Sequence, residues 1–238
     1  MKQSFGYTLA EVLITLAIVG IIAALTLPTL NTNAKRQTYA KTLAVAVSDF
    51  EAAMKNMMER EDVDSIKETR AWMHCNNVLN RNSSDADIQT FVNDLSPYID
   101  ISSFDNTSRS YRFLNSRFTW NVPGIKFKTK KGPEYDISLI DGNARDENTA
   151  YASGASYIEQ AATVSIDING NAAPNMIGRD LFFYELGANG TLYPYGSKDY
   201  NFYHGNDASS SSFANGCGGA ITSTCSEYLR QNGYKMDY

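Results

Sequence analysis

The chain has 238 residues, of which 43% are hydrophobic, so it can bury one sizeable core, and one globular domain with an appendage is expected. Its formal net charge is -5 and its pI is about 5.1. Nucleic-acid binding needs clustered Lys and Arg to neutralise phosphates, so this acidic balance argues against a nucleic-acid partner.

A long uncharged run lies near the N-terminus. No residue from Val12 to Ala34 is charged, and Val12 to Leu27 reads VLITLAIVGIIAALTL. A helix over residues 7–30 spans about 36 Å at about 1.5 Å per residue, enough to cross a hydrocarbon core of about 30 Å. The run is too long for the apolar part of an ordinary cleaved signal peptide. We therefore predict a transmembrane helix over residues 7–30.

The charges that flank this run are unusual for a plain membrane anchor. Glu11 stands at the head of the apolar run, where an ionisable group suggests a functional role with a specific partner. Lys2 precedes the run, whereas Lys35, Arg36 and Lys41 follow it. A simple positive-inside count would place the body of the protein in the cytoplasm.

The string GYTLAEVLITLAIVGIIAALTLP, Gly6 to Pro28, resembles the prepilin signature of type IV pilins and type II secretion pseudopilins. In that family a dedicated peptidase removes a short leader after a Gly, and the new N-terminus is methylated. The resemblance implies a leader over residues 1–6, cleavage after Gly6 and methylation of Tyr7, where the family usually has Phe or Met. Glu11 becomes the fifth mature residue. Pro28 becomes the twenty-second, where the family's long helix is often kinked or locally melted.

The resemblance also implies a role for Glu11 in assembly. Cleavage exposes an ammonium group at Tyr7, and the carboxylate of Glu11 lies about one helical turn away. In the family this carboxylate is thought to neutralise the amino terminus of a neighbouring subunit. A buried charge is tolerated when it is paired and strongly disfavoured when it is not. Glu11 and Pro28 are therefore the predicted assembly residues.

These features predict a structural, non-enzymatic subunit of a type II secretion pseudopilus or type IV pilus-like filament. Its expected partners are the prepilin peptidase/methyltransferase, other pilin or pseudopilin subunits in a homo- or heteropolymer, and the inner membrane. The head is expected outside the cytoplasm, and the mature subunit in a periplasmic or extracellular filament. The alternatives are a minor tip pilin or membrane-tethered adhesin that acts as a binding module, and an uncleaved signal-anchored protein.

A second helical pattern follows the apolar run. Apolar residues recur at three- and four-residue spacing over residues 31–60, at Tyr39, Leu43, Ala46, Val47, Phe50, Met54 and Met57. We predict an amphipathic continuation of the first helix, with an interruption near Pro28. Residues 61 to about 110 are polar and irregular, with one short helix predicted near Asp87 to Tyr98.

The second half of the chain has the pattern of short strands separated by tight turns. The predicted strands are FTWNV, IKFKTK, YDISLI, TVSIDI, LFFYEL and TLYPY, with turn pairs such as Pro123-Gly124 and Asn189-Gly190 between them. The alternating lysines from Lys126 to Lys131 are predicted on the solvent face of an edge strand. The fold class is therefore α+β: a long N-terminal helix, half transmembrane and half amphipathic, packed on an antiparallel sheet in a head over residues 61–238.

The three cysteines cannot all pair within one chain. A Cys217–Cys225 bridge closes a short loop and is the first choice, and pairing of either residue with Cys75 stays open. A short helix ended by a turn is predicted from Cys225 to Gly233.

One polar loop could hold a cation. Asp167, Asn169, Asn171 and Asp180 offer hard oxygen ligands of the kind that Ca²⁺ prefers. The loop is not an EF-hand, because Gly178 occupies the twelfth position. The alternative is an Asx-rich turn whose side chains bond their own backbone. No other cofactor is expected.

Overall fold

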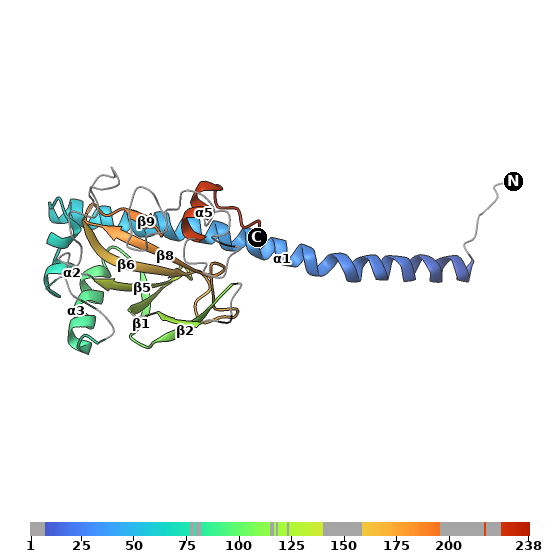
Figure 1. Cartoon of the computed structure of the whole chain (residues 1–238), viewed down its shortest axis with the longest axis horizontal. Coiled ribbons are helices and arrows are strands. Elements are labelled where there is room, and N and C mark those ends of the chain that lie inside the picture. Colours follow the sequence, from blue (N-terminus) through green and yellow to red (C-terminus); the bar gives the residue numbers. More distant parts are fainter. Residues whose placement is uncertain are drawn as a thin grey trace. The chain divides into compact units, whose positions relative to one another are not determined.

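A computed structural model of the chain describes residues 8–76, 79, 82–114, 117, 119–122, 124–139, 159–195, 217 and 225–238. It divides into two compact units, Met1–Thr38 and Tyr39–Tyr238. Helix α1, Leu9–Glu61, begins in the first unit and continues into the second, which holds all the other elements (Figure 1). The fold class is α+β, as the sequence predicts, because this long helix is followed by a curled β-sheet on which its second half packs.

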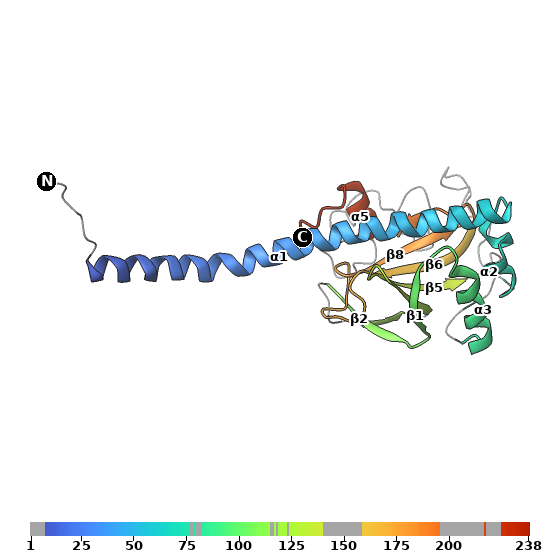
Figure 2. The same ribbon diagram turned by 180° about the vertical axis from the view of Figure 1, so that it is seen from behind.

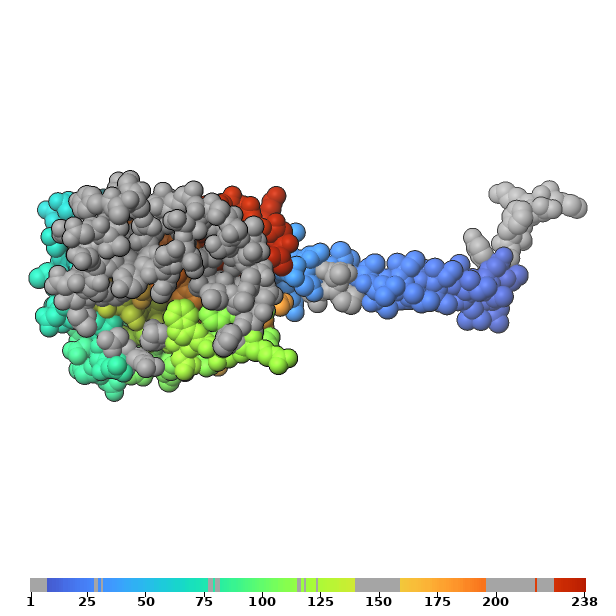
Figure 3. All heavy atoms as spheres, viewed as in Figure 1, coloured from blue at the N-terminus to red at the C-terminus, as the bar shows by residue number. Residues whose placement is uncertain are grey.

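The part of α1 in the first unit is apolar on all sides. Its most apolar window has a mean hydropathy of 2.4, and none of that window is buried within the structure. Side chains at successive angles around the helix, such as Leu13, Leu16 and Ile21, are all exposed. Figure 3 shows this segment of α1 in blue. A helix that is apolar all round needs an apolar environment. By length and composition, this segment is able to cross a membrane.

Helix α1 runs without a break through Pro28, so the predicted interruption at this residue is wrong. A proline removes one backbone hydrogen bond and costs about 3 kcal/mol in the interior of a helix. The hydrogen bonds before and after it remain, and apolar helices tolerate proline because side-chain hydroxyls and local adjustments satisfy freed backbone groups.

In the second unit, α1 turns one apolar stripe to the core, as predicted. Leu43, Met54 and Met57 are fully buried, whereas Lys55 on the opposite side is exposed. Figure 2 shows the second half of α1 lying along the sheet. Two contacts of Tyr135 in the sheet hold the stripe in place. Its ring stacks on Phe50 with centroids 5.1 Å apart, and its hydroxyl donates to the carbonyl oxygen of Ala46 at 2.9 Å.

The sheet contains nine strands: β1 (Ile101–Asp105), β2 (Arg109–Phe113), β3 (Thr119–Val122), β4 (Ile125–Thr129), β5 (Glu134–Leu139), β6 (Gln160–Asp167), β7 (Met176–Ile177), β8 (Leu181–Gly187) and β9 (Leu192–Pro194). Their order is β1-β4-β5-β6-β8-β7-β2-β3, and β9 also pairs with β8. The predicted strands are all present, as β3, β4, β5, β6, β8 and β9.

The sheet is mixed and not antiparallel as predicted. Strand β7 pairs in parallel with both β2 and β8. The chain between β2 and β7 passes through four intervening strands, β3 to β6, so this parallel pair is made by a long crossover connection. Hairpin turns visible in the sequence define only the antiparallel pairs, so this crossover could not be read from them.

The two faces of the sheet differ in chemistry. Ile137, Val164 and Phe182 belong to the apolar cluster that packs on α1, whereas Glu134 and Asp167 lie on the opposite face by the alternation of their strands. The sheet curls so that β2 reaches this polar face. Arg109 of β2 forms an ion pair with Glu134 of β5, and the hydroxyl of Tyr111 in β2 donates to Asp167 of β6 at 2.9 Å. The curl therefore encloses a charged interior.

The lysine stretch does not mark an edge strand, and that prediction is wrong. Strand β4 lies between β1 and β5. Lys126 is only 1% exposed, and its ammonium group pairs with Asp136 at 2.7 Å in the enclosed polar face. Lys130 and Lys131 are exposed. The alternation of lysines in the sequence does not show that the curled sheet buries one of them, Lys126.

The other helices among the described residues are η1 (Ile66–Glu68), α2 (Arg70–Met73), α3 (Asp85–Leu95) and α5 (Cys225–Gln231). The predicted helices near residues 87–98 and after Cys225 are present as α3 and α5. Ser84 caps α3 by accepting the backbone N–H of Asp87 at 3.2 Å. The region expected to be irregular also holds η1, α2, β1 and the start of β2. Its organising residue is Trp72, which is fully buried and contacts Phe91 of α3.

Candidate functional site

The first turn of α1 is closed by a capping box between Thr8 and Glu11. The backbone N–H and the hydroxyl of Thr8 both donate to Oε2 of Glu11, at 2.8 and 2.9 Å. In return, the N–H of Glu11 donates to the hydroxyl of Thr8 at 3.3 Å. This reciprocal pattern satisfies backbone donors that a helix start leaves without partners. The T-x-x-E sequence that encodes it is visible in the chain, and the sequence analysis overlooked it.

The capping box gives Glu11 a structural role in addition to the predicted role in assembly. Its carboxylate is fixed at the first turn of the helix, where the positive end of the helix dipole also favours an anion. Both groups of Glu11 that contact Thr8 are exposed. The carboxylate of Glu11 is therefore held next to Thr8, the residue that directly precedes α1.

The structure describes less of the other predicted processing and assembly residues. Gly6 and Tyr7 lie outside the described residues. Pro28 lies within α1, with its backbone in helical conformation. Glu11 is thus the member of the predicted set whose side-chain contacts are defined.

Comparison with known proteins finds a match at the N-terminal end of the chain. Residues 1–27 match the model of the prokaryotic N-terminal methylation motif, which is the prepilin signature of type IV pilins and pseudopilins. No curated protein and no solved structure matches the chain significantly. The match supports a type IV pilin-like or pseudopilin protein, a class of structural subunits that a prepilin peptidase processes and that assemble with other pilin subunits.

The structure shows one disulfide and one free thiol among the three cysteines. Cys217 and Cys225 form a disulfide across eight residues of sequence, the pairing that the sequence analysis put first. Cys75 is a free thiol buried at the end of α2. Burial raises the pKa of this thiol to about 11, with the negative charge of Asp87 adding to the effect. A thiol held protonated in this way is a poor nucleophile.

The aspartates of the predicted calcium loop have protein partners. Asp167, which is 2% exposed, accepts the Tyr111 hydroxyl on Oδ2 and the N–H of Asn169 on Oδ1, at 2.9 and 3.2 Å. The second contact is an Asx turn, the alternative considered from the sequence. Asn171 is exposed.

Asp180, the last residue of the predicted set, closes the same loop. Its two carboxylate oxygens accept the backbone N–H groups of Met176 and Asn175, at 2.5 and 2.8 Å. Within the described residues, no three His, Cys, Asp or Glu side chains are grouped to hold a metal ion. Calcium binding at this loop stays a prediction.

We expect the head to gain stability on mild acidification because of Asp167. Burial raises the pKa of this carboxyl to about 7; the Tyr111 hydrogen bond lowers it in part, and the charge of Asp180 raises it further. The folded state then holds a proton that the unfolded state releases above about pH 4. The contribution of Asp167 to stability therefore falls as pH rises from about 4 to about 7, by up to about 1.4 kcal/mol per pH unit, and is level above that.

Thermal melting of the full chain in detergent at pH 5 and pH 8 tests this expectation. Asp167→Asn should reduce the difference in Tm between the two pH values, and the exposed Asp64→Asn should leave it unchanged. An equal difference in all three proteins would contradict the role of Asp167. The same melts with and without a chelator test calcium, because a bound cation would raise Tm at pH 8 only when the chelator is absent.

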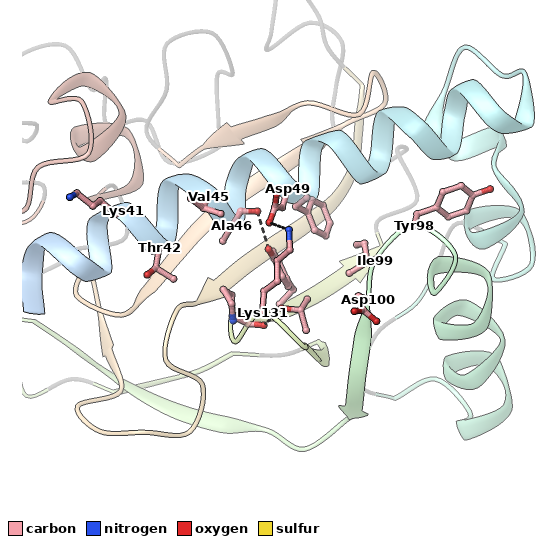
Figure 4. A pocket seen from close by; sticks show the side chains of 13 residues that line it. Lys41, Thr42, Val45, Ala46, Asp49, Tyr98, Ile99, Asp100 and Lys131 are labelled. Carbon is pink, nitrogen blue, oxygen red and sulfur yellow. Dashed lines mark hydrogen bonds and ion pairs between the residues drawn. The ribbon is translucent and has the colours of Figure 1, made fainter.

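A pocket of about 470 Å³ lies in the second unit, beside the second half of α1 (Figure 4). Ala46, Phe50 and Tyr135 give it an apolar floor. The ion pair between Lys131 and Asp49, 2.7 Å long, joins the sheet to the helix beside this floor. A recess of this size and composition suits a small apolar group.

Proposed function

We propose that the chain is a structural subunit of a type II secretion pseudopilus or a type IV pilus-like filament. The precursor is inserted in the inner membrane, cleaved after Gly6, methylated at Tyr7 and polymerised with its head outside the cytoplasm. The observation that carries this proposal is the N-terminal methylation motif over residues 1–27, followed by an uncharged apolar helix.

The geometry of Glu11 supports the assembly step. Once residue 7 becomes the terminus, its ammonium group lies next to Thr8, to which the carboxylate of Glu11 is bound. Helices that slide together in an apolar filament core bring one carboxylate and one ammonium group per subunit. Pairing them across subunits avoids buried, unpaired charges and fixes the register between neighbours.

Mass spectrometry of the mature N-terminus tests the proposed processing. The chain should be isolated from cells that contain a prepilin peptidase and compared with the chain from cells that lack it. The expected N-terminal peptide begins with methylated Tyr7 in the first case and with Met1 in the second. An intact leader on the protein in its final location would contradict the proposal and indicate a simple membrane anchor.

A tip-located minor pilin or membrane-tethered adhesin is the second candidate. The pocket beside α1 favours it, because a binding module needs a recess for its ligand. Replacing Glu11 separates a membrane-tethered adhesin from a filament subunit. The tethered adhesin keeps its ligand binding without this carboxylate, whereas a filament subunit, a minor pilin included, loses its assembly.

A further inference from the structure

The cations that follow the apolar run are unusual in having no acidic neighbours in the sequence. Glu11 and Asp49 are the nearest acidic residues on either side, so residues 12–48 contain cations only. Lys35 and Arg36 stand five and six residues beyond Leu30, and Lys41 follows. At about 1.5 Å per residue, Lys35 lies about 8 Å beyond Leu30, a distance that matches the headgroup layer next to a hydrocarbon core.

These cations also lack partners within the part of the chain that the structure describes. Neither Lys35 nor Arg36 forms an ion pair or a side-chain hydrogen bond there, and Lys35 is exposed. By contrast, cations of the head such as Lys67 and Lys126 are paired with carboxylates, at 2.6 and 2.7 Å. The cations after the apolar run therefore have their binding capacity available for a partner outside the chain.

The charge and position of Lys35 and Arg36 show what kind of partner fits. At about 100° per residue, Arg36 points about 100° away from Lys35, so the two side chains leave the helix in different directions. Lipid headgroups lie all around a helix that crosses a bilayer, and their phosphates offer negative charge to both side chains.

We propose that Lys35 and Arg36 bind the phosphates of anionic phospholipid headgroups in the outer leaflet of the membrane that α1 spans. This inference rests on the proposed membrane insertion. It names the binding partner at the outer end of the membrane-spanning part of α1. The long side chains reach back to the interface while the helix axis continues outward. The same contacts account for cations on the outer side of the span, where the positive-inside pattern would not place them.

The contact has a consequence for assembly. A subunit that leaves the bilayer for a filament must exchange its lipid phosphates for other partners or for water. Because each cation near an anionic surface changes binding by about fivefold at low ionic strength, the contacts hold the helix at a defined depth until it is extracted. They should weaken as salt is added.

Electron paramagnetic resonance with spin-labelled lipids tests the proposal on the full chain reconstituted in phosphatidylcholine vesicles. The fraction of motionally restricted label gives the relative affinity for phosphatidylglycerol over phosphatidylcholine. We expect a preference of about fivefold or more in low salt for the native chain, falling towards one in high salt. In the double variant Lys35→Gln/Arg36→Gln the preference should fall to about one.

Two control variants make the result specific to charge and position. Lys35→Arg/Arg36→Lys keeps both charges and should keep the preference. Lys55→Gln/Lys128→Gln removes two exposed cations elsewhere and should also keep it. A native chain without a preference, or a Lys35→Gln/Arg36→Gln variant that retains one, overturns the proposal. Resistance of the chain to alkaline extraction from the same vesicles is scored separately, so failure of insertion is distinguished from failure of headgroup binding.

Discussion

Replacing Glu11 by Ala is expected to leave membrane insertion and leader removal intact and to abolish filament assembly. Glu11 is the acidic residue nearest in the sequence to residue 7, where cleavage creates an ammonium group. An unpaired charge buried between subunits costs about 3–5 kcal/mol, which corresponds to a loss of association of more than about 100-fold. Cleavage is measured by the shift in mass of the membrane-bound chain, and assembly by the amount of subunit in sheared filament fractions.

Thr8→Ala separates the capping role of Glu11 from its role in neutralising an amino terminus. This variant loses the hydroxyl that both donates to Glu11 and accepts from it, at 2.9 and 3.3 Å. Loss of an N-cap costs about 1 kcal/mol, so assembly should fall only about fivefold. If Thr8→Ala and Glu11→Ala reduced assembly equally, Glu11 would act as a helix cap and the pairing between subunits would be wrong. Normal filaments from Glu11→Ala would refute the assembly role itself.

Lys126→Met should be among the most destabilising single substitutions in the head. Lys126 is 1% exposed and its ammonium group lies 2.7 Å from Asp136, which is 7% exposed. Removing one member of a buried ion pair leaves the other uncompensated and costs about 3–5 kcal/mol. Burial already raises the pKa of Asp136, and Lys126 opposes that shift. The loss should therefore become smaller as the pH falls, because a protonated Asp136 needs no cation.

A double variant shows whether the pair itself or the missing charge matters. Lys126→Met/Asp136→Leu replaces both partners by apolar groups and should recover most of the lost stability. Chemical denaturation of the full chain in detergent measures these changes, with Trp72 and Trp120 as fluorescent probes. Lys128→Met, on an exposed side chain of the same strand, is the control. Equal losses for Lys126→Met and Lys128→Met would show that the buried pair has no special weight.

The elements that the sequence predicted correctly are those whose signal is local. The stripe through Leu43, Phe50 and Met54 repeats with the period of a helix, and all three residues are buried as expected. Strands such as β5 and β8 are rich in aromatic and β-branched residues between turn pairs. In both cases the residues that form the element also identify it.

The features that the sequence did not show depend on long-range contacts. Strands β1 and β2 are polar and largely exposed, since only Tyr111 of β2 is buried in either strand. They are strands because partners from distant parts of the chain pair with them. The burial of Lys126 follows from the curl of the sheet, which no alternation of residues encodes. The capping box was missed for a different reason, because Glu11 was interpreted only through its resemblance to the prepilin signature.

The last residues of the chain belong to the folded head. The hydroxyl of Tyr238, the final residue, donates to the carbonyl oxygen of Gly178 at 2.8 Å, and Met236 is 8% exposed within the apolar cluster. Residues 236–238 thus help to hold a loop that lies 60 residues earlier in the sequence. The head can reach its final packing only after these residues have left the ribosome, and an affinity tag fused directly behind Tyr238 would lie next to this contact.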